Sequence, residues 1–545
     1  MKFNNLLNKK GVVLGFCFLL AVLFLLLGSK CSNLYPFNGW DDFNSFYTVG
    51  SGFYNGLLPY RDLFEQKGPL LYFIFMFGYM ISPGKFSGVF ILEIIFLTFT
   101  LYVSSLIIDL LYDNKKDVWG KYFILLLYTV ILVTSISFVE GGSSEEFNLL
   151  FGTISCYYII KYFKMGDLID ISYKDLVING ICCGLSLMIK YTMVGLWFIM
   201  MAYICIKLIR VKRYRDAILK GLVFILAMLI PFSCFIIYFC LNNGLKDFLD
   251  TYFYINIFKY RSDGGLLLNI IFALKHILTA IFSNIFLVIA LYSIFCYYLY
   301  KYGKKNNYSS KINKNDTINR DKKMGISKIK LSKIREKELV ILGMFLFTLI
   351  VLYYGQEFRP YAILGVFFIV LLVIIYMYRL FNQYKIFKIG CLIYILISLL
   401  VGIDYDYMFV DKKDIVQYRF ANIINQEENP TLLQYRSIDE GFYTAAGILP
   451  INKYFEQVNI SATKLNESYD EQDELIRNKK VMFVIVRKFD LDRNGKFNLH
   501  RDKKEAFNMR ANLDFISQYY DLVEVYKNKV GYYNTCNYYL YKVKD

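Results

Sequence analysis

Long apolar runs recur between residues 11 and 403, and they constrain the fold more than any other feature of the sequence. Most of these runs approach the roughly 20 residues that an α-helix needs to cross the hydrocarbon core of a bilayer. Hydrophobic residues make up 56% of the chain and charged residues only 20%, which excludes an ordinary soluble multidomain protein. The sequence therefore predicts an α-helical polytopic membrane protein.

Clusters of Lys and Arg set the expected topology, because such clusters remain on the cytoplasmic side of a membrane. The short run from Leu70 to Ile81 would place every later cluster outside if it crossed, so we expect it to lie in the outer interface or to re-enter. About eleven crossings then remain, with the amino terminus inside and the tail outside the bacterial cytoplasmic membrane. The expected spans are 11–28, 86–111, 121–139, 147–163, 176–189, 193–209, 221–241, 279–300, 339–355, 361–379 and 389–403.

The chain divides into a membrane domain, residues 1–403, and a polar tail, residues 404–545. Residues 301–338 are expected to form a basic cytoplasmic loop. Much of the net charge of +17 falls in such inner loops, where anionic lipid headgroups explain it without nucleic acid. In the tail, short β-like runs alternate with polar helical stretches, which predicts a small extracytoplasmic α/β domain. That domain either covers or selects what the membrane domain binds, or it stabilises the membrane domain.

The first outer loop, residues 29–85, combines acids, bases and aromatic residues. The aromatic residues after Asp41 and Asp42 recur at helical spacing, so we expect an amphipathic helix on the interface with the acid pair at its start. Arg61 and Lys67 lie beside a Pro-Tyr turn and a second interfacial stretch, where cations can meet an anionic phosphate at headgroup depth. The structural alternatives are that the acids cap a helix and that the two bases extend to lipid headgroups.

The motifs of this loop resemble those of bacterial membrane glycosyltransferases of the GT-C class. The branch concerned is related to the protein O-mannosyltransferases and to the aminoarabinose transferases of lipid A, and is often labelled RgtA/B/C/D-like. Three further stretches match, and they contain Glu145 and Glu146, then Lys190, then Arg359 and Tyr361. The first-loop pattern is the acid pair followed by Gly-x-x-Pro-Tyr-Arg-Asp-Leu-Phe-x-x-Lys-Gly-Pro-Leu-Leu-Tyr from Gly56 to Tyr72.

The resemblance implies an enzyme that takes a sugar from a polyprenyl phosphate or diphosphate and passes it to a glycan, lipid or protein acceptor of the cell envelope. Substitution at the sugar carbon needs a base for the incoming hydroxyl group and cations for the departing phosphate. The motif assigns the base to Asp41 or Asp42, with inversion at the sugar carbon, and the carrier phosphate to Lys67. Which aspartate acts as the base stays open.

The remaining substrate-binding candidates follow from the same motifs. Arg61 and Arg359 are expected to assist at the phosphate, and Lys190 and Tyr361 to contact substrate. Glu145 and Glu146 either orient the acceptor or hold a divalent cation, since carboxylates suit such ions; they can also be an ordinary helix start. No certain cofactor follows from the sequence.

Two other functions compete with sugar transfer. A transporter or flippase of lipid-linked glycans shares the polytopic architecture, but such proteins place their substrate sites near the bilayer midplane, often within two similar halves. Here the densest charge lies in an outer loop, and no clear internal repeat is visible. A noncatalytic partner in polysaccharide assembly would tolerate loss of the acid pair.

Overall fold

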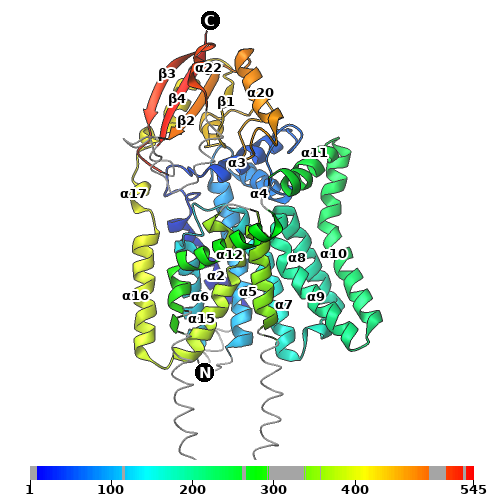
Figure 1. Ribbon diagram of the computed structural model, residues 1–545. Helices are drawn as coiled ribbons and strands as arrows, with labels where there is room; N and C mark the ends of the chain where they lie inside the picture. Colours follow the sequence, from blue (N-terminus) through cyan, green and yellow to red (C-terminus); the bar gives the residue numbers. More distant parts are fainter. Residues whose placement is uncertain are drawn as a thin grey trace, which may run out of the picture.

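The computed structural model of the chain describes residues 9–112, 117–260, 265–290, 292–293, 337, 339–355, 358–489, 511–531 and 536–544. Figure 1 shows a body of roughly aligned helices with a smaller unit containing a β-sheet above one end. We refer to that end of the body as its loop end. The smaller unit comprises the described residues after 403 and is called the C-terminal unit.

The body is built from the apolar runs of the sequence, and six described helices are long and apolar enough to cross a membrane, or seven if one bent pair is a single span. The other apolar helices are shorter or carry more charge. The protein is thus a multi-pass membrane protein, while the expected number of crossings and their orientation stay predictions. The helices of the body are α2 (Lys10–Gly28), α5 (Ser87–Leu111), α6 (Val118–Thr134), α7 (Ser144–Met165), α8 (Tyr173–Ile189), α9 (Gly195–Arg210), α10 (Tyr214–Leu241), α12 (Leu266–Ser283), Leu339–Tyr353, α15 (Phe368–Phe381) and α16 (Lys385–Gly402).

Small residues allow neighbouring helices of the body to approach closely, as is usual between membrane helices. Gly184 in α8 is an example, because a Cβ atom at this position would lie 2.3 Å from the backbone oxygen of Met228 in α10. Ser143 caps α7 by accepting a hydrogen bond from the backbone N–H of Glu146, which satisfies one free donor at the helix start. Local sequence thus determines both where a helix begins and how it packs.

The run expected to cross at 279–300 is divided in the structure. Helix α12 extends from Leu266 to Ser283, and further helix follows at 285–290. Apolar residues continue across this break, so hydropathy alone did not reveal that Asn284 interrupts the helix. Most of the expected basic loop at 301–338 lies outside the described residues.

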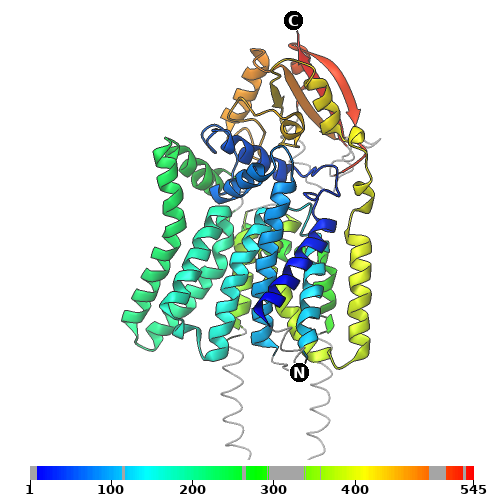
Figure 2. The ribbon, with the colours of Figure 1, turned by 180° about the vertical axis from the view of Figure 1, so that it is seen from behind.

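Two short helices of the first loop lie across the loop end of the body (Figure 2). They are α3 (Asp41–Tyr54) and α4 (Pro69–Ile81), and they pack against each other. At 13 residues, α4 is shorter than a membrane span, in agreement with the expectation that this run does not cross. The expected helix with the acid pair at its start is present as α3, but it has no free apolar face, because every residue of α3 except Asp42 and Tyr54 is buried.

Two neighbours explain this burial: α4 covers the aromatic side of α3, where Phe43 and Phe46 contact Phe75, and the C-terminal unit covers its polar side. Ser45 donates a hydrogen bond to Glu456 Oε2 at 2.5 Å, and Thr48 donates one to Asp439 Oδ2 at 2.5 Å. Gly441 makes the close approach possible: its φ is +89°, and a Cβ atom there would lie 2.6 Å from Asn44 Oδ1. Polar positions of α3 that suggest exposure in the sequence are buried contacts in the fold.

The sheet of the C-terminal unit confirms the expected α/β character of the tail. It has four strands in the order β1-β2-β4-β3, with β1 and β2 parallel and the other pairs antiparallel. The domain boundary after residue 403 stays a prediction. The elements of the unit are β1 (Leu432–Gln434), β2 (Phe483–Phe489), β3 (Tyr520–Lys527) and β4 (Cys536–Val543), with helices α17 (Tyr405–Met408), α18 (Val416–Ile424), α19 (Phe442–Ala446), α20 (Asn466–Arg477) and α22 (Leu513–Ser517).

Candidate active site

A polar cavity of about 50 Å³ lies near the junction of the first loop and the helical body. Four other segments contribute to its wall: the turn after α8, the π-helix η3 (Asp250–Lys259) with Tyr260 after it, the end of helix Leu339–Tyr353, and the start of the 3₁₀-helix η4 (Pro360–Val366). Its lining residues are Gln66, Lys67, Lys190, Tyr191, Thr192, Tyr252, Asn256, Tyr260, Leu352, Tyr353, Arg359 and Ala362. Three of the cations singled out in the sequence, Lys67, Lys190 and Arg359, therefore line one cavity.

Lys67 is held on both its backbone and its side chain. Its backbone N–H donates to Glu65 Oε2 at 2.8 Å and to the Tyr72 hydroxyl at 2.9 Å, and its backbone oxygen accepts from the Tyr60 hydroxyl at 2.7 Å. Its Nζ lies 3.6 Å from Glu65 Oε1 and 4.0 Å from Asp42 Oδ2. Burial lowers the pKa of Lys67, but the charges of Asp42 and Glu65 outweigh it and raise the pKa above its ordinary value. The ammonium group is thus fixed and charged.

Glycine is required immediately after this lysine. A Cβ atom at Gly68 would lie 2.1 Å from the backbone oxygen of Met188, and the backbone N–H of Gly68 donates to the oxygen of Ile189 at 2.9 Å. The first loop is therefore tied to the carboxyl end of α8, just before Lys190. This contact brings two lysines that are distant in the sequence to the same cavity.

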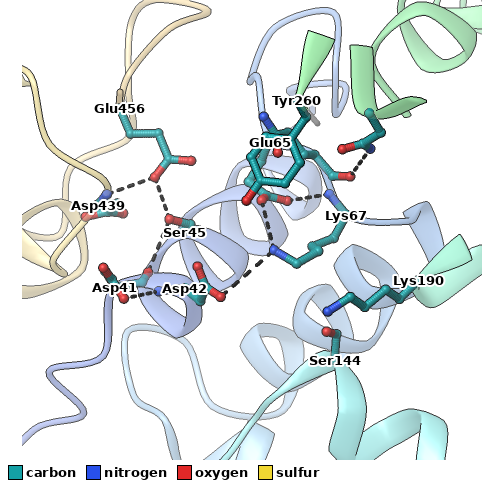
Figure 3. A network of polar contacts seen from close by, with 12 residues as sticks. Asp41, Asp42, Ser45, Glu65, Lys67, Ser144, Lys190, Tyr260, Asp439 and Glu456 are labelled. Carbon is teal, nitrogen blue, oxygen red and sulfur yellow. Dashed lines mark hydrogen bonds and ion pairs between the residues drawn. The ribbon is translucent and has the colours of Figure 1, made fainter. Parts of the chain in front are cut away.

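Asp42 is the aspartate that faces the cations (Figure 3). Its Oδ2 accepts a hydrogen bond from the Tyr361 hydroxyl at 3.1 Å, and that hydroxyl also accepts one from Arg359 Nη1 at 3.1 Å. Burial raises the pKa of the Asp42 carboxyl, but the charges of Lys67 and Arg359 outweigh it, so the pKa falls below its ordinary value. Asp42 is consequently an ionised carboxylate at the edge of a cationic cavity.

Lys190 completes the cationic wall. Its ammonium group forms an ion pair with Glu145, whose side chain is 1% exposed, and lies 5.8 Å from the centre of the Tyr361 ring. Burial lowers the pKa of Lys190, and the nearby charges of Lys67 and Arg359 lower it further, against the opposing effect of Glu145. An additional anion in the cavity would therefore stabilise the charged form of Lys190.

Asp41 lies on the opposite side of the α3 start from the cations. Its Oδ1 accepts a hydrogen bond from the backbone N–H of Asp42 at 3.0 Å, and its backbone oxygen accepts one from Ser45. Figure 3 shows Asp41 and Ser45 on the side of Asp439 and Glu456 in the C-terminal unit. The structure therefore separates the two aspartates that the sequence could not distinguish.

Besides Asp41, the expected site residues Arg61 and Glu146 do not line the cavity. Arg61 pairs with Asp62 at 2.8 Å and donates to the backbone oxygen of Asn242 at 3.0 Å, and it is absent from the cavity wall. Glu146 accepts a hydrogen bond from the backbone N–H of Gly142 at 3.0 Å. It points to a different set of neighbours from Glu145, although the two glutamates adjoin in sequence.

The divalent cation that the resemblance left open finds little support in the geometry. Within the described part of the chain, no group of three or more His, Cys, Asp or Glu side chains could hold a metal ion. Glu145 is paired with Lys190, whereas the side chain of Glu146 is hydrogen-bonded to the backbone N–H of Gly142 and to Glu93. The two adjacent glutamates of the described structure therefore do not share one metal site.

Several residues of the site were missed in the sequence. Glu65 and Gln66 occupy the two variable positions of the Phe-x-x-Lys motif, so only their closeness in sequence to Lys67 could have indicated that they belong to the site. Thr192 follows Lys190 by two residues, which is a similar clue. Tyr260 accepts a hydrogen bond from Arg359, but it lies in a segment without a recognisable motif.

Comparisons with known proteins identify the fold. No family model and no curated protein matches the sequence. Among solved structures, ArnT of Cupriavidus metallidurans bound to undecaprenyl phosphate is similar over 96% of this chain and 98% of that chain, with a TM-score of 0.55 and 9% identity. The apo state of ArnT is similar over 87% and 93%, with a TM-score of 0.53 and 10% identity.

A third structure is that of the archaeal oligosaccharyltransferase AglB from Archaeoglobus fulgidus, in complex with an inhibitory peptide and a dolichol-phosphate. It is similar over 88% of this chain and 69% of that chain, with a TM-score of 0.46 and 12% identity. ArnT is the aminoarabinose transferase of lipid A and belongs to the GT-C glycosyltransferases. The chain therefore has the fold of the GT-C membrane proteins, as the motifs of its first loop indicated.

Proposed function

We propose that the protein transfers a sugar from a polyprenyl phosphate or diphosphate carrier to an acceptor of the cell envelope, with Asp42 as the base. The observation that carries this proposal is the convergence of Lys67, Lys190 and Arg359 on one cavity whose edge is an ionised carboxylate. Sugar transfer from a phosphate needs this combination of cations and base. ArnT, which shares the fold, binds undecaprenyl phosphate.

The three cations would hold the phosphate of the carrier and stabilise the charge that develops as the bond to the sugar breaks. Charged donors that are fixed before the reaction need no reorganisation when that charge appears. Lys67 is fixed by Glu65 and Asp42, and Arg359 is anchored through its backbone oxygen, which accepts from the Tyr353 hydroxyl at 3.0 Å. The phosphate thus enters a prearranged site.

Asp42 would accept the proton of the acceptor hydroxyl while the acceptor oxygen bonds to the anomeric carbon. The bond from that carbon to the phosphate oxygen breaks in the same displacement, and the electron pair leaves with the phosphate. A single displacement inverts the configuration at the sugar carbon. Tyr361 orients Asp42 through its hydrogen bond, whereas Asp41 faces the C-terminal unit and is not needed as a base.

The site would operate at the outer face of the bacterial cytoplasmic membrane. The basic turn between α9 and α10, which includes Arg210 and Lys212, lies at the end of the body opposite α3 (Figure 1). Basic loops remain in the cytoplasm, which supports an outward position for α3 and the cavity. The acceptor is accordingly a glycan, lipid or protein outside the cytoplasm.

The decisive experiment supplies the purified protein with a panel of polyprenyl-linked sugars and measures release of the carrier. Asp42→Asn should lower turnover by about 10²- to 10⁴-fold, the usual contribution of a general base, while Asp41→Asn should retain most of it. Lys67→Ala should mainly weaken use of the donor lipid. Full turnover by Asp42→Asn would exclude this base, and lipid movement across vesicles without any turnover would indicate a flippase.

A further inference from the structure

Two neutral side chains in the wall of the cavity have polar atoms without a hydrogen-bond partner in the described structure. They are Nε2 of Gln66 and Oγ1 of Thr192, and the two residues are only 8% and 4% exposed. Buried polar groups are nearly always hydrogen-bonded, so each exception requires an explanation. Two exceptions in one cavity point to a ligand that is bound there.

The chemistry of these atoms defines the ligand. The amide nitrogen of Gln66 can only donate, and the hydroxyl of Thr192 can donate as well. The cations in the same wall, Lys67, Lys190 and Arg359, also only donate. A cavity with this set of donors suits an oxyanion that has several acceptor oxygens.

Both neutral donors are placed by the elements that carry the cations. Gln66 directly precedes Lys67, and its backbone oxygen accepts a hydrogen bond from Asn256 Nδ2 at 2.8 Å, which fixes its peptide group. Thr192 lies in the short 3₁₀-helix η2 (Tyr191–Val194), directly after Lys190 and Tyr191. The backbone thus places each neutral donor next to a cation of the cavity wall.

The size of the cavity matches one phosphate group. A volume of about 50 Å³ is well above the roughly 10–15 Å³ that a single water molecule needs, so a small oxyanion such as a phosphate group fits. The sugar of the carrier would then lie beyond the phosphate, toward Asp42.

We propose that Gln66 and Thr192 donate hydrogen bonds to oxygens of the carrier phosphate, and that they determine how tightly the carrier binds. This inference rests on the proposed function for the identity of the carrier. It adds two neutral binding residues to the three cations. Neutral donors orient the phosphate oxygens without adding to the mutual repulsion of the cations.

The test measures equilibrium binding of polyprenyl phosphate to the purified full chain, and of inorganic phosphate in a separate arm. Thr192→Val removes only the hydroxyl and should weaken lipid binding about tenfold or more, the usual effect of losing a hydrogen bond to a charged group. Thr192→Ser keeps the hydroxyl and should bind like the unaltered protein. Gln66→Leu should also weaken binding, and Gln66→Glu should weaken it further because a carboxylate repels phosphate.

A matched control is available in α5. Thr98 is also buried, at 6% exposed, and its Oγ1 likewise lacks a partner in the described structure, but it does not line the cavity. Thr98→Val should leave lipid binding unchanged. Thermal unfolding of each variant identifies any that bind poorly because they are misfolded, and the Gln66 variants decide the question if Thr192→Val does not fold.

The outcomes separate this inference from the proposed function. Unchanged lipid binding in folded Thr192→Val and Gln66→Leu proteins would overturn the inference and leave the roles of the cations intact. Failure of the unaltered protein to bind polyprenyl phosphate would instead remove the proposed function. Equally tight binding of inorganic phosphate would show that the cavity serves free phosphate and would overturn the carrier as its occupant.

Discussion

The ion pair between Lys190 and Glu145 allows stability and substrate binding to be separated. The side chains of Glu145 and Lys190 are 1% and 16% exposed, so the pair is buried. Removing one partner from such a pair costs about 3–5 kcal/mol, because the other charge is left buried and uncompensated. Lys190→Met should therefore unfold at a lower temperature and should also bind the carrier phosphate less tightly.

The double variant Lys190→Met with Glu145→Gln removes both charges together. It should recover most of the lost stability, since replacing a whole buried pair by neutral groups is often nearly neutral. It should not recover phosphate binding, because a charged hydrogen bond worth about 1.5–3 kcal/mol, or about 10- to 100-fold in affinity, is still missing. Thermal unfolding in detergent and equilibrium binding of polyprenyl phosphate measure the two effects.

Lys207→Met serves as the control, because Lys207 pairs with Asp167 away from the cavity. This pair is more exposed, at 25% and 23%, so its loss should cost less stability and no binding. Full binding and turnover in the double variant would refute the reasoning. Lys190 would then serve only to neutralise Glu145.

Three further predictions follow from the site and its supports. The pKa of Lys190 is lowered, and only the protonated form would bind phosphate, so carrier affinity should be present below that pKa and fall as the pH rises through it. In a binding titration, Lys190→Arg should lose affinity only at higher pH, because arginine stays charged. Burial raises the pKa of Glu456 well above its ordinary value, so the neutral amide of Glu456→Gln should preserve turnover. Glu456→Ala should instead lower kcat about tenfold with little change in carrier affinity, because Ser45 loses a hydrogen bond. Equal kcat in both variants would contradict this prediction. Gly68→Ala should reduce the yield of folded protein seen by size-exclusion chromatography, because its Cβ would collide with the backbone of Met188.

The architecture of the protein could largely be predicted from its sequence. Bilayer-length apolar runs give helices whatever their partners, because an unpaired backbone group is costly in lipid. In the tail, the short β-like runs of the sequence correctly predicted the positions of the four strands. Hydropathy did not locate the break at Asn284, because long apolar runs lie on both sides of it and average hydropathy does not report where a helix stops.

The candidate site was only partly predictable, because its geometry depends on contacts between distant segments. The motif identified Lys67, but the preference for Asp42 over Asp41 follows from the direction in which α3 begins. Arg61 belongs to the same motif, but its side chain forms an ion pair with Asp62 and does not line the cavity. Gln66 and Thr192 carry no charge, and their importance depends on a cavity that forms only in the folded chain.

The burial of α3 between the helical body and the C-terminal unit has a consequence for protein engineering. Residues 404–545 are not an interchangeable module, since Glu456 and Asp439 bond directly to Ser45 and Thr48 of α3. A chimera that receives a foreign tail would lose these bonds and shift α3, the helix that carries Asp42 in its first turn. Exchange of the tail between proteins of this fold would therefore require grafting α3 together with it.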